Sequence, residues 1–457
     1  MTLLEEIKRD FLKLLFVENR YATWVYAAVA QQLEKLGHQI HWLVQNPVFK
    51  PAFGCVHIMP FPSNLTGKVN APVEYEWLAR TDRGVLHFGA TGAHYPHYDE
   101  QVREHLQRIK PDVIFGEATE FHELLVIRHA KAMSIRYLSP NVTRYPADRL
   151  AFFAYDTLQP VGGDGSQLSD AESDRMLEEI RQRRVVPSYM RPNVSTPRNL
   201  PLSKLADKIR ITWGWLCGER YITPSPLRKL ALNAAQKKAR AQWEAQAAAQ
   251  IGPWTDLKTS KTPWVLYALQ MQPEGNIDVW GSPWNDQAEI IRRAAASLAA
   301  VGATLVVKPN PKSKYEMNER LSQVVCSTPN VVALPHATPM AEVFPFAPLV
   351  LSVTGTILME CIFSGKPVAC LGKHAMAHYP GVTQISKPEF VAEVLQSAER
   401  GLLAVATAEE ARNLLQKLHS SSYSAAIWDP VTKPDFGNII VVESLTTAFH
   451  SVIELHK

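Results

Sequence analysis

Cysteine is scarce in this chain of 457 residues, and its five cysteines form no CxxC pair. They are Cys55, Cys217, Cys326, Cys361 and Cys370. An odd number without close pairs argues against a disulfide framework and against a zinc cluster. We therefore expect the cysteines to be small residues of the protein core.

Long apolar segments are also missing. No run of about 18 uncharged apolar residues occurs, which argues against a membrane-spanning helix. At the N-terminus, Glu5 and Glu6 stand where a secretory signal peptide would need a basic and then an apolar segment. We therefore expect the protein to stay in the cytoplasm.

Neither sign of charge dominates the composition. Lysine and arginine number 48 and aspartate and glutamate 44, which gives a net charge of +4. So small an excess does not indicate a nucleic-acid partner, but it suits an anionic substrate or loose contact with an anionic membrane face. No paired DxD and no cluster of histidine and acidic residues at zinc spacing stands out, so we expect no metal.

The sequence does contain two series of strands that alternate with helices. The first opens with strand 11–17, helix 23–36 and strand 39–44, and the second runs from 264 to 371. Such alternation predicts parallel sheets with helices on both faces. With hydrophobic residues at 46%, the chain is long enough for two globular domains. We predict the α/β class, with two doubly wound, Rossmann-like domains.

Changes of character along the chain give the expected domain bounds. We expect residues 1–160 to form the first domain, 161–260 a helical insertion or interdomain region, 261–390 the second domain, and 391–457 helices that pack back on the first. The basic residues of the insertion include Arg181, Arg183, Arg184, Arg191, Lys229, Lys237, Lys238 and Arg240. They line a groove for an anionic glycan, lie against a membrane or form a solvated face.

The stretch 349–363 has the pattern of a strand, a tight turn and a helix. The apolar run 349–353 predicts a buried strand, and Thr354, Gly355 and Thr356 form the turn before the helix. Such a turn offers backbone N–H groups and a helix N-terminus to a phosphate. Glu360, one helical turn farther on, is placed to accept hydrogen bonds from ribose hydroxyls. The alternative is an ordinary strand-helix junction with a solvated Glu360.

Two other strands of the second series end in polar residues. Lys308 ends strand 304–308 just before Asn310, and Gln270 opens a long polar loop after strand 264–269. Parallel strands end at one edge of a sheet, so we expect Gln270, Lys308 and Asn310 to converge there with the 354–356 turn and to bind a nucleotide sugar. Lys308 then pairs with a phosphate. The alternatives are a capping amide for Gln270 and a snorkelling lysine for Lys308.

In the first series, polar residues follow strand 112–116. Glu117, Glu120 and His122 stand beyond its carboxyl end, where acceptor-binding or acid–base groups belong. The alternative is that the acids stabilise the positive end of the following helix.

The motifs of the second series resemble those of a known family. They are Leu-Gln-Met-Gln-Pro-Glu at 269–274, Asp-Gln at 286–287, Leu-Val-Val-Lys-Pro-Asn-Pro at 305–311, Ser-Val-Thr-Gly-Thr at 352–356 with Glu360, and Ser-Gly-Lys-Pro-Val at 364–368. In order and spacing, residues 262–385 resemble the capsule and lipopolysaccharide polysaccharide-biosynthesis glycosyltransferases. That group includes enzymes that use CMP-activated 3-deoxy-manno-octulosonic acid (Kdo).

The resemblance implies a GT-B architecture, with an acceptor domain and a nucleotide-sugar-binding domain facing each other across a cleft. It implies that Lys308 contacts the donor phosphate, that Thr354, Gly355 and Thr356 contact the phosphate or base region, and that Glu360 contacts the ribose. Glu274 falls where related transferases carry an acidic residue and is the expected catalytic group, with Glu117 as the next candidate. Asn310 departs from the family, which favours histidine before proline.

The resemblance further implies a glycosyltransferase that moves Kdo or another nonulosonate-like sugar from a CMP donor. The expected partners are this donor and a surface polysaccharide or lipid-linked acceptor, with peripheral association at the inner membrane. The nucleotide sugar is a substrate, and no cofactor is expected. The alternatives are a nucleotide-sugar epimerase or hydrolase of the same fold and a non-catalytic scaffold of a polysaccharide assembly complex.

Overall fold

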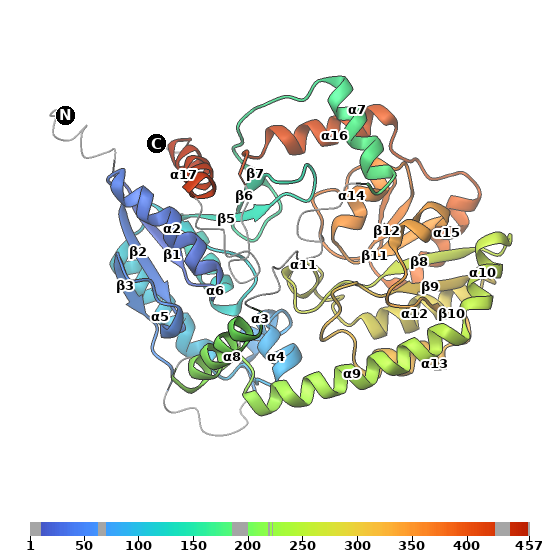
Figure 1. The fold of residues 1–457 in the computed structure, drawn as a ribbon, viewed down its shortest axis with the longest axis horizontal. Coiled ribbons are helices and arrows are strands. Elements are labelled where there is room, and N and C mark those ends of the chain that lie inside the picture. Colours follow the sequence, from blue (N-terminus) through green and yellow to red (C-terminus); the bar gives the residue numbers. More distant parts are fainter. Residues whose placement is uncertain are drawn as a thin grey trace. The chain divides into compact units, whose positions relative to one another are not determined.

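The computed structural model describes residues 11–62, 70–184, 200–217, 220–221, 223–425 and 439–455 (Figure 1). The chain divides into two compact units, each with a sheet of its own. The first unit comprises Met1–Leu168, Val186–Pro226 and Leu415–Lys457, and the second Ser169–Val185 and Leu227–Leu414. This division differs from the expected domain bounds, because both units share the region 161–260. Of the segment 391–457, which was expected to pack back on the first domain, residues 391–414 belong to the second unit. The N-terminal segment 1–10 and Arg191 lie outside the described residues.

The first unit contains a seven-stranded sheet in the order β3-β2-β1-β4-β5-β6-β7. Its strands are β1 (Lys13–Val17), β2 (Gln39–Val44), β3 (Cys55–Ile58), β4 (Val113–Phe115), β5 (Arg136–Val142), β6 (Leu150–Ala154) and β7 (Pro160–Val161). Strands β1 to β5 pair in parallel, whereas β6 and β7 add an antiparallel edge that the sequence did not predict. The helices of this unit are α2 (Ala22–Lys35), η1 (Pro47–Phe49), η2 (Val73–Tyr75), α3 (Glu76–Ala79), α4 (Arg83–Phe88), α5 (Tyr95–Ile109), α6 (Phe121–Ala132), α8 (Leu200–Cys217) and α17 (Ile439–Glu454).

An aromatic core joins the two ends of the chain in the first unit. Phe16 of β1 stacks on Phe115 of β4 with ring centroids 5.2 Å apart, and Phe449 of α17 lies 4.9 Å from Phe115. Helix α17 also packs on α2, and Figure 1 shows the two side by side. Burial of these rings supplies much of the hydrophobic free energy of this unit, so its core depends on a helix more than 300 residues from β4.

The second unit contains a six-stranded sheet in the order β10-β9-β8-β11-β12-β13, with all strands parallel. The strands are β8 (Trp264–Ala268), β9 (Thr304–Lys308), β10 (Val331–Ala333), β11 (Leu349–Ser352), β12 (Val368–Cys370) and β13 (Val382–Gln384). The helices are α7 (Asp170–Arg181), α9 (Pro226–Ala249), α10 (Ile251–Thr259), α11 (Gly275–Asp278), α12 (Gln287–Ala299), α13 (Glu319–Ser327), η4 (Met340–Glu342), η5 (Phe344–Phe346), α14 (Thr356–Phe363), η6 (Pro388–Phe390) and α15 (Val391–Glu399). Helix α16 (Ala408–Ser420) begins in the second unit and passes into the first at Leu415.

Both faces of the second sheet are buried. Along β8, Val265 and Tyr267 belong to one hydrophobic cluster, and Trp264 and Leu266 belong to another on the opposite face. This arrangement explains why the strand reads as a continuous apolar run instead of an alternating one. The predicted α/β class with two mostly parallel sheets is therefore confirmed.

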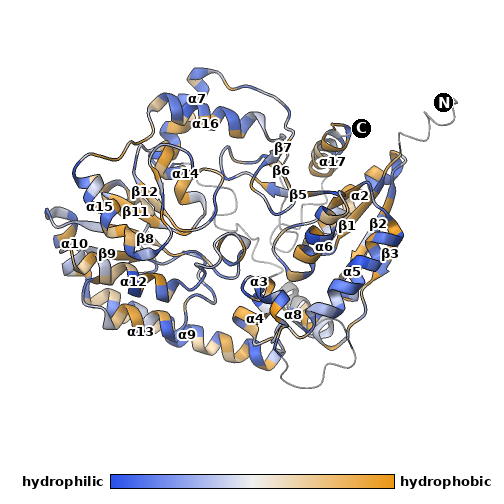
Figure 2. Cartoon of the chain, turned by 180° about the vertical axis from the view of Figure 1, so that it is seen from behind, coloured by the Kyte–Doolittle hydropathy of each residue, from blue (hydrophilic) through white to orange (hydrophobic). Residues whose placement is uncertain are grey.

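Helix α9 buries only a narrow face. Ala239, Trp243 and Ala247 recur every four residues and are fully buried, and Nε1 of Trp243 donates to the carbonyl of Leu334 at 2.8 Å. Figure 2 shows hydrophobic and hydrophilic residues interleaved along this helix. Two alanines and one indole therefore form the buried face of α9.

The expectation of core cysteines holds for two positions and is wrong for two others. Cys361 and Cys370 are buried, whereas Cys55 and Cys326 are exposed. Cys55 begins the edge strand β3, and Cys326 lies in the last turn of helix α13. The side chain of Cys217 lies outside the described residues. Within the described part of the chain, no helix has the length and apolar character needed to cross a bilayer.

Candidate functional site

Three neighbouring strands of the second sheet end in the polar residues that the sequence singled out. Lys308 is the last residue of β9, and Gln270 and Thr354 follow β8 and β11. Because β8 lies between β9 and β11 in a parallel sheet, all three leave the same edge. The strand order also reverses between β8 and β11. Open α/β sheets bind ligands at such a switch point, outside the carboxyl ends of the strands.

Gln270 and Thr354 are joined across the switch point by two hydrogen bonds. Nε2 of Gln270 donates to Oγ1 of Thr354 at 3.0 Å, and the N–H of Thr354 donates to Oε1 of Gln270 at 3.3 Å. Both residues are buried, with 9% and 1% of their surface exposed. These are the contacts of a structural amide, so a direct role of Gln270 toward a ligand stays a prediction.

Gly355 is needed by the backbone at this turn. Its φ of 93° lies in the left-handed region, and an added Cβ would come within 2.8 Å of Nε2 of Gln270. Helix α14 begins at the next residue, Thr356, and the first N–H groups of a helix have no partner within it. The predicted turn at 354–356 is therefore present, with a helix N-terminus directly behind it.

The loop that follows β8 contains a short helix, α11, which the sequence did not predict. Glu274 precedes it, and its N–H donates to Oδ2 of Asp278 at 3.2 Å. One carboxylate oxygen of Glu274 accepts from Nδ2 of Asn276 at 3.4 Å, and the carbonyl of Asn276 accepts from Oγ1 of Thr354 at 2.7 Å. The half-buried Glu274 is thus connected through Asn276 to the 354–356 turn.

A buried network that the sequence did not predict holds this loop in place. Nε2 of Gln272 donates to Oδ1 of Asp278 at 2.7 Å, and its N–H donates to Oε2 of Glu316 at 2.9 Å. Gln287 exchanges two hydrogen bonds with the backbone of Gln270, at 2.8 and 2.7 Å. The motif Gln-x-Gln with a later Asp-Gln was visible in the sequence, but the partners of these amides are set by tertiary contacts.

Lys308 is a buried cation at the end of β9. It is 4% exposed, and its Nζ donates to the carbonyl of Pro309 at 2.7 Å. Burial, and then the charge of Arg183, lower the pKa of Lys308 to about 8. Next to it, Oδ1 of Asn310 accepts the N–H of Lys312 at 2.8 Å and so closes its own turn. The ammonium of Lys308 is thus a buried charge that an anionic ligand would stabilise.

Glu360 is not solvated, which corrects the alternative considered for this helix. It is 6% exposed and forms an ion pair with Arg183, which follows α7. The two residues are 177 positions apart, and Arg183 had no feature in the sequence that set it apart from its basic neighbours. Arg183, which sequence reasoning missed, is therefore brought to Glu360 by tertiary packing alone.

In the first unit, Glu117 follows β4 at the point where the strand order reverses between β1 and β4. The residue is half-buried, and its Oε2 accepts from Nδ2 of Asn19 at 3.4 Å. Burial, and then the negative charge of the buried Glu123, raise the pKa of Glu117 to about 8. A carboxyl group that exchanges its proton near neutral pH is suited to acid–base chemistry.

Glu120 and His122 are engaged within the protein. Glu120 is 2% exposed and forms an ion pair with Arg83 at 3.0 Å, and it directly precedes helix α6. Nε2 of His122 lies 2.7 Å from the carbonyl oxygen of Glu18, and His122 is buried. The structural alternative therefore fits Glu120, and Glu117 is the one of the three that keeps a partly exposed position.

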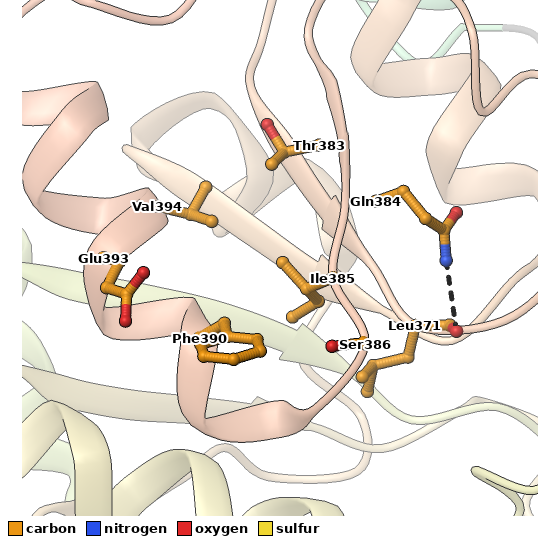
Figure 3. A pocket seen from close by; sticks show the side chains of 8 residues that line it. All are labelled: Leu371, Thr383, Gln384, Ile385, Ser386, Phe390, Glu393 and Val394. Carbon is orange, nitrogen blue, oxygen red and sulfur yellow. Dashed lines mark hydrogen bonds between the residues drawn. The ribbon is translucent and has the colours of Figure 1, made fainter.

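A pocket of about 550 Å³ lies elsewhere on the second sheet, beside the ends of β12 and β13 (Figure 3). Phe390 and Glu393 line it, together with Gln384, whose Nε2 donates to the carbonyl of Leu371 at 3.2 Å. None of the predicted site residues lines this pocket. Over the part of the chain that the structure describes, no group of three or more histidine, cysteine or acidic residues is arranged to hold a metal ion.

Several solved structures are similar to this chain in fold. A UDP-GlcNAc 2-epimerase from Neisseria meningitidis bound to UDP-GlcNAc shares 13% identity, with 96% of this chain and 100% of that chain covered and a TM-score of 0.29. A glycosyltransferase from Rickettsia africae shares 10%, with 97% and 99% covered and a TM-score of 0.30. The calicheamicin glycosyltransferase CalG4 shares 14%, with 97% and 98% covered and a TM-score of 0.27. Such low scores decide nothing about the reaction.

The sequence comparisons are more specific. No curated protein matches the chain. A family model described as Capsule polysaccharide biosynthesis protein matches residues 219–413. This segment contains the ends of β8, β9 and β11, and with them all the predicted site residues of the second unit. Residues 219–413 are thus similar to the capsule polysaccharide biosynthesis protein family.

Proposed function

We propose that the protein is a glycosyltransferase that moves a sugar from a nucleotide donor to a surface polysaccharide or lipid-linked acceptor. The observation that supports this function best is the buried cation Lys308 at the same edge of the sheet as the 354–356 turn, one strand away from the switch point. A cation, a glycine turn and a helix N-terminus together suit a phosphate group. They lie in the segment that matches a capsule biosynthesis family.

In this proposal Lys308 contacts the donor phosphate, and Thr354, Gly355 and Thr356 contact the phosphate or base region. Glu360 contacts the ribose once its carboxylate is released from its ion pair. Gln270 and Asn310 shape the site, because their side chains already hold the turns at the ends of β8 and β9.

The chemistry is assigned to a carboxylate. Glu274 acts at the anomeric carbon as base or nucleophile, and its connection to Thr354 through Asn276 supports this placement. Glu117 is the second candidate, supported by its pKa of about 8. For the donor sugar we propose Kdo or another nonulosonate-like sugar carried by CMP, which is supported by the sequence resemblance alone.

We also propose that the protein works in the cytoplasm, in peripheral contact with the inner membrane, through α8. Four large apolar side chains on this helix are 50–61% exposed, namely Leu205, Ile209, Trp213 and Leu216. Their spacing places them on one face. Gly214 lies on the opposite face, where an added Cβ would be 3.1 Å from Nδ2 of Asn46. Lys208 of the same helix is exposed, and a cation next to an apolar face suits an anionic lipid surface.

Nucleotide titration tests the first step of this proposal. CMP, UDP and GDP at millimolar concentration are compared by thermal unfolding, and at least one should raise the melting temperature, because binding to the folded state alone stabilises it. We expect the largest rise with CMP. If none of the three raises it, the proposed function is wrong.

Turnover then separates the alternatives. CMP-Kdo and UDP-sugars are incubated with the protein, with and without a glycolipid extract from a capsule-producing cell. Nucleotide release that requires the extract supports transfer. Release without it, together with an altered or free sugar, supports an epimerase or hydrolase instead. Binding without turnover under any condition supports a non-catalytic scaffold.

A further inference from the structure

Arg183 occupies an unusual position for an arginine in a region rich in basic residues. It forms an ion pair with Glu360 of α14, and the two side chains are only 14% and 8% exposed. Its guanidinium also lies 4.6 Å above the ring of Phe344, which is itself buried. A side chain held by a carboxylate and an aromatic face has lost much of its hydration, so its position is specific.

The chain brings Arg183 to this place by a defined route. Helix α7, whose N-cap Ser169 accepts the N–H of Glu172 at 3.3 Å, packs against α14. Nε of Arg181 donates to the carbonyl of Phe363 at the end of α14, at 2.7 Å. Two residues later, Arg183 adopts a left-handed φ of 52°, which turns the chain after the helix. The segment Ser169–Val185 therefore belongs to the second unit, although the chain on both sides of it belongs to the first.

Positive charge exceeds negative charge around Arg183. Glu360 is its carboxylate partner, but Lys308 is a second buried cation, close enough for the charge of Arg183 to lower its pKa. Nε of Arg183 is buried and has no hydrogen-bond partner among the described residues. Lys366 also lies over the Phe344 ring, with its Nζ 5.5 Å from the ring centroid. Among the described residues named here, three cations therefore accompany one carboxylate, and one buried donor of Arg183 is left to be satisfied.

We propose that Arg183 is an anion ligand of the donor site, and that it exchanges Glu360 for a phosphate group of the nucleotide sugar. This inference rests on the proposed function and deepens it, since it adds a second phosphate-binding cation beside Lys308. Arginine suits this exchange, because its planar guanidinium binds carboxylate and phosphate with the same fork geometry. Release of Glu360 then frees its carboxylate for the ribose hydroxyls.

The proposal predicts opposite effects for the two partners of the ion pair when the probe has no ribose. We expect Arg183→Ala to weaken the binding of inorganic pyrophosphate by about tenfold or more, because a charge-assisted contact is lost. Glu360→Gln should strengthen it by about threefold or more, because the competing carboxylate is removed. A purely structural ion pair predicts that neither variant binds pyrophosphate differently from the wild type.

The experiment is a calorimetric titration of the full-length protein with pyrophosphate and with CMP. Arg183→Lys joins the series, because it keeps the charge at the site and should bind more tightly than Arg183→Ala. Arg184→Ala is the matched control, since Arg184 is the next residue and is exposed. It should bind both probes like the wild type. Melting curves without ligand show which variants are folded. If Arg183→Ala does not fold, the two single variants Glu360→Gln and Arg183→Lys still decide the test.

The outcomes separate the two proposals. If the wild type binds CMP, but Glu360→Gln binds pyrophosphate no more tightly and Arg183→Lys binds it unchanged, the ion pair is structural and this inference is wrong. If the wild type binds neither pyrophosphate nor any nucleotide, the proposed function itself fails. Tighter pyrophosphate binding by Glu360→Gln, with weaker binding by the Arg183 variants, supports the exchange.

Discussion

Replacing Lys308 with methionine should stabilise the second unit at neutral pH, although lysine is the natural residue. The ammonium is 4% exposed, and burial followed by the charge of Arg183 lowers its pKa from 10.5 to about 8. A lowered lysine pKa means that the folded protein holds this proton more weakly than the unfolded chain does. The charge therefore lowers the free energy of unfolding, by its full amount below pH 8. This destabilisation disappears as the pH rises to 10.5.

The magnitude follows from the two pKa values. Their difference corresponds to a loss of about 3 kcal/mol in the free energy of unfolding at pH 7. Methionine is similar in length and carries no charge, but it also loses the 2.7 Å hydrogen bond from Nζ to the carbonyl of Pro309, worth about 1 kcal/mol. The free energy of unfolding should therefore rise by about 2 kcal/mol at pH 7 and by about 1 kcal/mol at pH 9. Above pH 10.5 it should fall slightly below that of the wild type.

Thermal unfolding at pH 7, 9 and 10.5 measures this difference. For a unit of this size, about 2 kcal/mol corresponds to a rise of about 4–8 °C at pH 7. Lys314→Met is the control, because Lys314 lies in the same loop and is exposed, and it should leave the melting temperature nearly unchanged. The same Lys308→Met protein should bind nucleotide about 1.5–3 kcal/mol more weakly. A variant that is no more stable than the wild type at pH 7, or whose gain does not shrink with rising pH, would refute the reasoning.

Two further predictions concern catalysis and the membrane. Glu274→Gln should leave nucleotide affinity nearly unchanged and lower turnover by about two to four orders of magnitude, measured as nucleotide release with acceptor present. Turnover near the parent rate would make Glu274 structural and move the chemistry to Glu117. In that case wild-type turnover should rise through pH 8, as the Glu117 carboxyl loses its proton, and Glu117→Gln should abolish that rise. For α8, the double variant Ile209→Gln with Trp213→Gln should reduce co-sedimentation with phosphatidylglycerol vesicles by about tenfold, whereas Leu227→Gln, at the still more exposed start of α9, should not. If the double variant sediments with the vesicles as well as the wild type does, α8 is not the membrane contact.

Much of the fold could be predicted because burial on both faces of a parallel sheet leaves a local signature. The segments of β1, β8, β9 and β11 contain runs of three to five apolar residues, each followed by a polar residue or a turn. Gly355 could be recognised for the same reason, since a turn that needs a left-handed φ selects glycine. Even the convergence of Lys308, Gln270 and Thr354 followed from the rule that parallel strands end at one edge.

The sequence failed where the deciding contact lies far along the chain. The antiparallel strands β6 and β7 and the shared use of 161–260 by both units depend on pairings that no local period encodes. The short helix α11 formed inside an expected loop because Asp278 accepts from both Gln272 and the backbone of Glu274. Exposed cysteines on β3 and α13 likewise depend on which faces the rest of the chain covers.

What the sequence by itself determined is which residue types stand at the ends of the strands, and hence that a polar edge exists. Only the tertiary structure decided their burial, their pKa values and their partners. Burial and a distant arginine lower the pKa of Lys308, and burial beside Glu123 raises that of Glu117. The ion pair between Arg183 and Glu360 spans 177 positions. Desolvation and charge coupling depend on distance in space, and the spacing of residues along a chain does not report that distance.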